Sequence, residues 1–288
     1  MHKWPLAYAK CNGRSLKAIP LRDHLKLTAS LSTCLLAERF RQLRRILNRD
    51  LIKLRDVVDL EELVYMISLL HDLGKASIQY YEVFAKQVKS SQSLVELRFH
   101  GHEHIISCLI ETLTLLERED EVFMAVCDLL AKVISRHHSA MEERHPLRFT
   151  PRPDFMKIVN GMCNNIVTNF IEKELLGVCN EKNYKLCTRI LKSLIRHIEN
   201  KHLCEQTTWF ECKRGIQSFS LSVLTSSFND QSLRGVYKLV SALTGILIIS
   251  DNLAADYEGR ASDEGSSRLY VAHWKRELSD YLKKCLRD

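Results

Sequence analysis

The chain has 288 residues, of which 45% are hydrophobic; that is enough for one large domain or two small ones, and it excludes a disordered chain. Glycine and proline number only 10 and 5, which argues against a turn-rich β-sandwich or barrel and predicts an all-α protein. The net charge of +7 is spread along the chain; it is compatible with a polyanionic partner without requiring one.

The N-terminal twenty residues lack the apolar stretch of a secretion signal, and the longest apolar run, residues 242–250, is too short to span a bilayer. We therefore expect a soluble, cytoplasmic protein with no membrane partner. The ten cysteines include no CxxC pair, which argues against a thiolate zinc site. We expect them to be reduced and buried, with a bridge between Cys204 and Cys212 as the alternative.

Helical spacing of apolar residues predicts a first helix over residues 20–47, with His24 near its start. A second helix is predicted over 57–70. Asp59 and Glu62 have the spacing of a capping box there, and the apolar residues lie on one face. The far end of this helix leads into His71 and Asp72, and residues 84–99, polar in the middle, are predicted to form a loop.

Two histidine-flanked helices follow: one over 100–120 begins among His100, His102 and His104, and one over 121–138 ends at His137 and His138. Three prolines between residues 139 and 153 predict an irregular connection that could act as a lid.

Further helices are expected over 155–177 and 183–201, whereas 203–234 is ambiguous because residues 216–228 partly alternate like a strand. A nearly all-apolar helix over 236–257 is interrupted by Asp251, and a last helix is expected over about 269–285.

An imidazole and a carboxylate in one short segment, as at His71 and Asp72, commonly begin a metal site. Adjacent residues point about 100° apart on a helix, so these two can bind one ion only where the helix end loosens. A carboxylate at Asp251, in an apolar helix, would cost several kcal/mol unless it were paired or bound to a cation. Each histidine taken alone could instead be a surface or capping residue.

Taken together, the segments "DHL", "HDLGKAS", "HE", "RHH" and "SDNLAAD" resemble the HD metal-dependent phosphohydrolase superfamily. "HDLGKAS" followed by a double histidine resembles most closely the HD nuclease of type I CRISPR interference. The resemblance spans residues 20–257. It implies an all-α HD-domain helical bundle with a metal site between core helices, forming a single HD nuclease domain over 1–288. The metal-binding core would cover about 20–257.

The resemblance also implies the ligands of two ions. His24, His71, Asp72 and Asp251 would hold the first, and Asp72 would be shared with a second ion held by His102, His137 and His138. His102 is preferred over His100 and His104 because the family's third histidine precedes a glutamate and, four to five residues later, small residues such as Ser107. His104 would then orient the ligands without binding an ion.

Two ions about 3.5–4 Å apart suit phosphodiester cleavage, because they activate a water and neutralise the phosphate. Asp72 would act at the reacting centre, and Lys75 would contact the phosphate or steady the ligands. Imidazole-rich sites favour transition metals, so Mn, Ni or Co is expected, with Fe, Zn or Mg as alternatives.

The resemblance implies single-stranded DNA as the substrate, with single-stranded RNA as the alternative. The chain contains no GxxxxGK[ST] motif, so it resembles the stand-alone subunit, which works with a separate helicase and a guide-RNA effector complex. Two groups of basic residues could follow a phosphate backbone or simply be solvated: Arg41, Arg44 and Arg45, and Arg136, Arg144, Arg148 and Arg152. A nucleotide phosphohydrolase and a non-catalytic interaction subunit remain rival interpretations.

Overall fold

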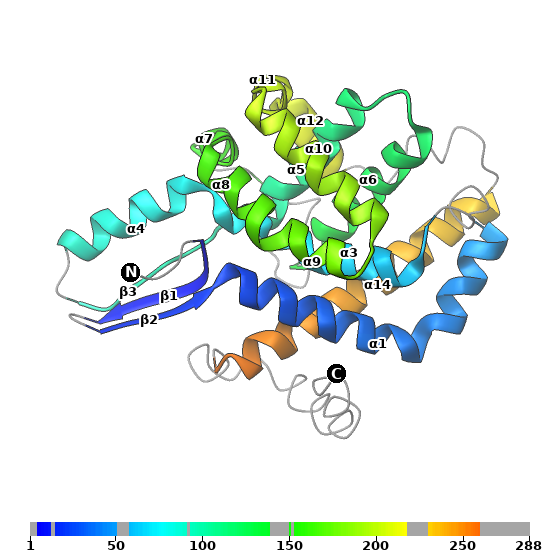
Figure 1. Ribbon diagram of the computed structural model, residues 1–288, viewed down its shortest axis with the longest axis horizontal. Coiled ribbons are helices and arrows are strands. Elements are labelled where there is room, and N and C mark those ends of the chain that lie inside the picture. The colour runs from blue at the N-terminus through cyan, green and yellow to red at the C-terminus, as the bar shows by residue number, and fades with distance from the viewer. Residues whose placement is uncertain are drawn as a thin grey trace.

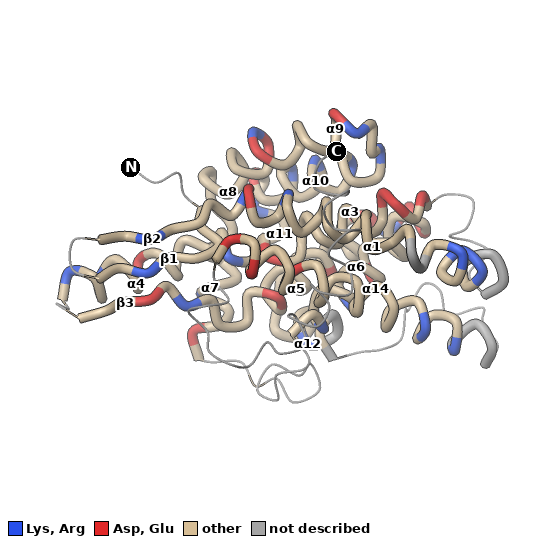
Figure 2. The backbone as a smooth tube through the Cα atoms, turned by 90° about the horizontal axis from the view of Figure 1, so that it is seen from below, with Lys and Arg blue, Asp and Glu red and all other residues tan. Residues whose placement is uncertain are grey.

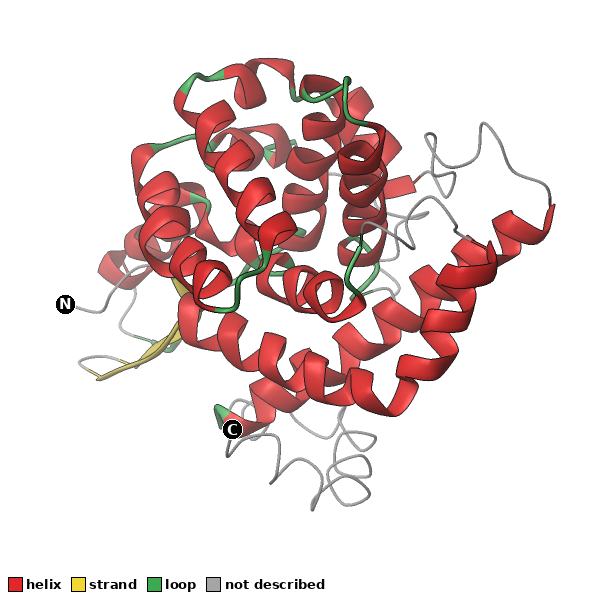
Figure 3. Cartoon of the chain, turned by 45° about the vertical axis from the view of Figure 1, so that its right-hand side comes forward, coloured by secondary structure: helices red, strands yellow, loops and turns green. Residues whose placement is uncertain are grey.

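Helices make up most of the chain in the computed structural model, which describes residues 5–12, 15–50, 58–90, 93–138, 150, 153–217 and 230–259. This confirms the predicted helical bundle (Figures 1 and 3). In chain order the helices are α1 (Leu21–Asp50), α3 (Leu60–Leu70), α4 (Ile78–Ser90), α5 (His102–Leu116), α6 (Glu121–Ile134), α7 (Phe155–Asn160), α8 (Asn165–Phe170), α9 (Gly177–Glu181), α10 (Lys185–Glu199), α11 (His202–Gln206), α12 (Trp209–Gln217) and α14 (Asp230–Tyr257).

Helix α3 lies in the hydrophobic core and is buried on nearly all sides, not on one face as its sequence predicts. Asp59 caps its N-terminus by accepting hydrogen bonds from the backbone of Glu61 and Glu62. Glu62 does not complete the predicted capping box. Its Oε1 accepts from the backbone N–H groups of Leu186 and Cys187, in the first turn of α10. The tertiary structure therefore redirects this carboxylate to a second helix N-terminus.

The two longest helices, α1 and α14, run antiparallel and side by side, and both pack against α3 (Figure 1). Three buried serines join them: Ser32 Oγ lies 2.6 Å from Ser68 Oγ and 2.5 Å from Ser250 Oγ. Residues Arg234–Tyr257 are long and apolar enough to cross a membrane, but 56% of the most apolar window is buried in the bundle. A core helix of a soluble protein has the same properties.

A small three-stranded sheet, in the order β2-β1-β3, was not predicted. β1 (Leu6–Asn12) pairs antiparallel with β2 (Ser15–Pro20) and with β3 (Val95–Glu96). The dipeptide Asn12–Gly13, at the end of β1, is a strong hairpin signal that the helix-rich composition obscured. The hydroxyl of Tyr81 accepts from Leu6 N at 2.8 Å and lies 3.0 Å from Lys75 O, so the sheet contacts the segment after α3.

Two predicted elements are wrong in extent. Helix α4 covers residues 78–90, so the first part of the expected 84–99 loop is helical. Only Tyr80 of this helix is buried, so its apolar residues do not form a clear helical pattern in the sequence. The expected 155–177 helix is broken between α7 and α8, where Asn164 caps α8, and it continues through a π-helical turn, Ile171–Leu176. In the segment left ambiguous, 203–234, the described residues form α11, α12 and the start of α14. The 216–228 alternation, the 139–153 connection and the 269–285 helix fall largely or wholly outside the described residues.

The cysteines also correct an expectation. Among the described residues, disulfides join Cys108 to Cys212, Cys163 to Cys204, and Cys179 to Cys187. Cys204 and Cys212, the pair considered from sequence spacing, therefore bond to other partners. Sequence proximity does not decide these pairs, because the packing of α12 against α5 brings together residues 104 apart.

Candidate metal centre

The segment after α3 presents His71 and Asp72 to a common point. The helix ends at Leu70, His71 is its C-cap, and Asp72 leaves helical geometry with φ −105° and ψ 5°. This is the loosened helix end that adjacent ligands require. A 3₁₀ turn, Leu73–Ala76, follows, and a Cβ at Gly74 would collide with the carbonyl of His102. Glycine therefore allows the turn to lie directly against the start of α5.

A first set of side chains, called group one, consists of His24, His71, Asp72 and Asp251, whose ligand atoms all lie within 4.8 Å of one another. His24 comes from the first turns of α1 and Asp251 from α14. Nε2 of His24 lies 3.1 Å from both Asp72 Oδ2 and Asp251 Oδ1. Nε2 of His71 lies 3.4 Å and 3.6 Å from the same two oxygens.

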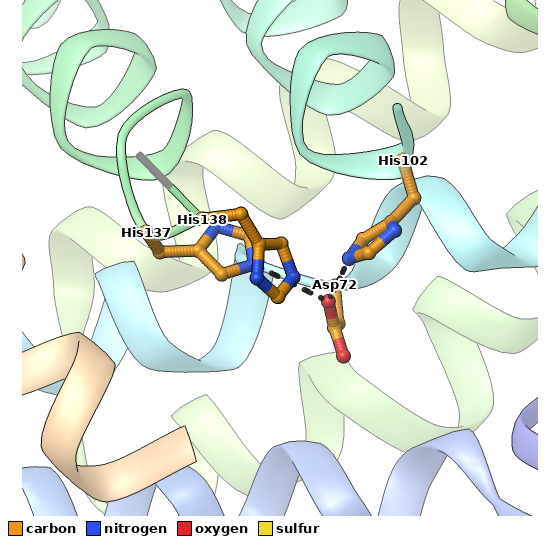
Figure 4. Close-up of side chains that lie close together, drawn as sticks. All are labelled: Asp72, His102, His137 and His138. Atoms are coloured by element: carbon orange, nitrogen blue, oxygen red, sulfur yellow. Dashed lines mark ion pairs between the residues drawn. The ribbon is translucent and has the colours of Figure 1, made fainter. Parts of the chain in front are cut away.

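A second set, called group two, consists of Asp72, His102, His137 and His138, again within 4.8 Å. The three histidine rings surround the Asp72 carboxylate (Figure 4). Nε2 of His102 lies 2.6 Å from Asp72 Oδ1, and Nε2 of His137 lies 3.7 Å from it. The two oxygens of Asp72 therefore face different groups: Oδ2 faces group one and Oδ1 faces group two.

Three histidine rings are held in one orientation by the backbone. Nδ1 of His71, His102 and His137 lies 2.7 Å from the carbonyl oxygen of the residue three positions earlier. A carbonyl can only accept, so Nδ1 carries the proton and Nε2 presents a lone pair to the centre. Nε2 of His71 and of His137 is buried and makes no hydrogen bond to a described residue. Lone pairs that face carboxylate oxygens need a cation between them, so these residues fit a bound metal.

Burial and nearby charges keep Asp72 and Asp251 ionised and His102 neutral, which are the protonation states that can bind a metal. Burial alone would raise the pKa of Asp72, but His71, Lys75 and His102 outweigh it and hold that pKa well below its usual range. The pKa of Asp251 is likewise lowered, because the neighbouring imidazoles of His24 and His71 outweigh its burial. Burial lowers the pKa of His102 to about 4, so this imidazole is neutral near pH 7.

Among the described residues, Lys75 is the lysine whose ammonium group contacts the centre. It is 7% exposed, and its Nζ donates to Asp72 Oδ2 at 2.5 Å across the 3₁₀ turn. Nζ also lies 5.4 Å from the centroid of the Phe99 ring. The helix does not continue to Lys75, but the i,i+3 contact with Asp72 forms through the tighter turn.

Other predicted residues lie elsewhere. His100 lines a groove beside α4 and its carbonyl accepts from Tyr80, while His104 is fully buried and belongs to neither group. Arg41, Arg44 and Arg45 are exposed toward the end of α1, away from the sheet (Figure 2). Arg136 turns inward and donates to Lys132 O, and burial lowers its pKa to about 10. Arg144, Arg148 and Arg152 lie outside the described residues.

Two contacts around the centre were not predicted: the serine cluster of Ser32, Ser68 and Ser250, and the contact of Glu258 with His24. Both join residues far apart in the chain. A carboxylate seven residues after Asp251 was the only available signal for Glu258, since that spacing returns to the same side of a helix after two turns.

The family model described as "Cas3, HD domain" matches residues 8–258. The chain belongs to this family. It is an HD nuclease domain of the type I CRISPR Cas3 type. This confirms the resemblance. The HD family comprises metal-dependent hydrolases, and HD domains bind divalent metals. No curated protein and no solved structure matches the chain.

Proposed function

We propose that this chain is a nuclease of type I CRISPR defence that hydrolyses phosphodiester bonds of single-stranded DNA at a centre of two divalent ions. The proposal rests on the position of the Asp72 carboxylate. Its two oxygens face two separate sets of imidazole and carboxylate donors, so one buried carboxylate is placed to bridge two ions. The family match supports a nucleic-acid substrate.

The chain's own residues prepare this chemistry. Two ions held by groups one and two would lower the pKa of a bound water toward about 7 and neutralise the scissile phosphate. Lys75 fixes the Asp72 carboxylate through Oδ2. The backbone carbonyls at positions 68, 99 and 134 keep three imidazole lone pairs directed inward. We assign Asp72 to the reacting centre and Lys75 to steadying it.

The donor set favours a transition metal. Groups one and two together offer five imidazoles and two carboxylates. We propose Mn, Ni or Co, because imidazole-rich sites bind these ions better than Mg; Fe and Zn suit the same donors.

We further propose that a separate helicase subunit, working in the cytoplasm with a guide-RNA effector complex, supplies the strand. The exposed residues Arg41, Arg44 and Arg45 lie about 25–32 Å along α1 from His24, at 1.5 Å per residue. They would therefore contact a strand several nucleotides from the cut rather than the scissile phosphate.

The test uses chelator-stripped protein resupplied with Mn, Ni, Co, Mg or Zn. It measures cleavage of end-labelled single-stranded DNA, single-stranded RNA, duplex DNA and deoxynucleoside triphosphates. We expect metal-dependent loss of single-stranded DNA, abolished in Asp72→Ala and retained in Asp23→Asn, which changes an exposed carboxylate beside His24. Cleavage confined to RNA would change the substrate, and cleavage confined to nucleotides would make the protein a nucleotide phosphohydrolase. No cleavage with any metal would favour a non-catalytic subunit.

A further inference from the structure

His24 differs from the other oriented histidines in the partner of its Nδ1 atom. His71, His102 and His137 each donate from Nδ1 to a backbone carbonyl. Nδ1 of His24 instead lies 3.1 Å from the carboxylate oxygen Oε1 of Glu258. The two residues are 234 positions apart in the chain, so only the packing of α14 against α1 brings them together.

The position of His24 in its helix explains why a side chain is needed. His71 and His137 follow the last residues of α3 and α6, where backbone carbonyls have no partner within the helix. His24 is the fourth residue of α1, and the carbonyl three positions earlier, at Leu21, lies in the regular hydrogen-bond ladder of the helix. The fold therefore supplies an acceptor from another element.

We propose that Glu258 is a positioning residue for the group-one metal ion: it accepts the Nδ1 proton of His24 and so holds the Nε2 lone pair toward Asp72 and Asp251. This inference rests on the metal centre of the proposed function and assigns Glu258 to it. A carboxylate behind a metal-binding imidazole fixes the ring's tautomer and orientation and raises its basicity.

The backbone around Glu258 is well placed for this task. Its N–H donates to the carbonyl of Ala254, which continues the last turn of α14. Gly259 follows with φ +72°, a left-handed conformation that glycine adopts without strain and that ends the helix. The carbonyl of Gly259 accepts from Lys17 Nζ of β2 at 3.2 Å. The Glu258 side chain itself is 10% exposed.

Glu258 belongs to neither ligand group among the described residues. Its contact is with the far side of the His24 ring, 3.1 Å from Nδ1, while Nε2 of that ring lies 3.1 Å from Asp72 and Asp251. The arrangement is therefore carboxylate, imidazole and ion in series, and the effect of Glu258 must pass through His24.

The first experiment measures Mn binding by calorimetry in the full chain. We expect Glu258→Ala to weaken the group-one ion by about 10–100-fold. Glu258→Gln should lose less, because its amide oxygen can still accept from Nδ1. Glu199→Ala, which removes an exposed carboxylate at the end of α10, is the matched control and should bind as the unmodified chain does. A change of less than threefold in Glu258→Ala would overturn the proposal.

A double-variant cycle tests whether Glu258 acts through His24. In a His24→Ala background, Glu258→Ala should cause no further loss of Mn affinity. A full additional loss would show that Glu258 acts independently of His24 and would overturn the proposal.

The Nδ1 proton of His24 gives a readout that does not depend on activity. In ¹⁵N spectra of the protein loaded with diamagnetic Zn, His24 should carry its proton on Nδ1, and Glu258→Ala should shift the Nδ1–H resonance and speed exchange of that proton with solvent. An unchanged Nδ1–H resonance would overturn the proposal. If the protein cuts no nucleic acid but these results hold, the proposed function fails and the role of Glu258 stands.

Discussion

Groups one and two share Asp72 but are built from different parts of the helices. The other members of group one project from the early turns of α1, the end of α3 and the interior of α14, and the buried serine cluster joins these three helices. Those of group two come from the first residue of α5 and the turn after α6. Group one therefore depends on helix packing, whereas group two depends on the local geometry of helix ends.

Under the proposed function, one carboxylate would serve two sites of different origin. Asp72 lies where the two groups meet: its Oδ2 faces group one and its Oδ1 faces group two. We expect changes at Asp72 to affect both groups and changes elsewhere to separate them.

The largest effect is expected from Asp72→Asn, which should bind neither ion and reduce nuclease activity to the metal-free background. The unpaired ammonium of buried Lys75 should also lower the free energy of unfolding by about 3–5 kcal/mol. Metal content and denaturant unfolding measure the two effects. Adding Lys75→Met should restore stability but not activity, and retention of two ions in Asp72→Asn would contradict the shared carboxylate.

Asp251→Asn and His137→Gln should each remove one ion and leave the other, because each residue belongs to one group only. We expect nuclease activity to fall by about 100-fold or more in both, since both ions stabilise the same transition state. Metal stoichiometry by mass spectrometry provides the measurement. Loss of both ions from either variant would show that the two groups do not form independently.

The pH dependence of stability should single out His102 in group two. Its folded pKa of about 4 lies below its ordinary value of 6.5, so the unfolded chain binds the proton more readily. The stability of the metal-free protein should therefore fall as pH decreases from about 6.5 to 4, and His102→Gln should flatten this decline. Asp72 and Asp251, with lowered pKa values, should contribute losses only below pH 3.8. Thermal unfolding across this range tests both statements.

The smallest effect is expected from Ser250→Ala, which removes a buried hydrogen bond between α1 and α14. Unfolding free energy should drop by about 1–3 kcal/mol, and only the group-one ion should bind more weakly. Ser90→Ala, at the exposed end of α4, is the control. Equal weakening of both ions would mean that helix packing supports group two as well.

Several elements could be predicted because their signals are local. Apolar periodicity located α1, α3, α10 and α14, and Asp59 was correctly placed as a cap. The predictions failed where local signals were weak or overridden: the short β-hairpin, the exposed face of α4, and Glu62, which caps α10 instead of its own helix. The cysteines were expected to be reduced, and their pairing could not be predicted because sequence distance says little about which helices pack together.

The sequence by itself determined which donor groups the chain offers, since His24, His71–Asp72, His137–His138 and Asp251 stand at spacings that resemble the family's pattern. Tertiary structure alone decided which oxygen of Asp72 faces which group, how Lys75 reaches it, and that Glu258 lies behind His24. The physical reason is distance along the chain. Local periodicity sets the face on which a residue lies, but only the packing of α1, α3, α5, α6 and α14 sets what that residue meets.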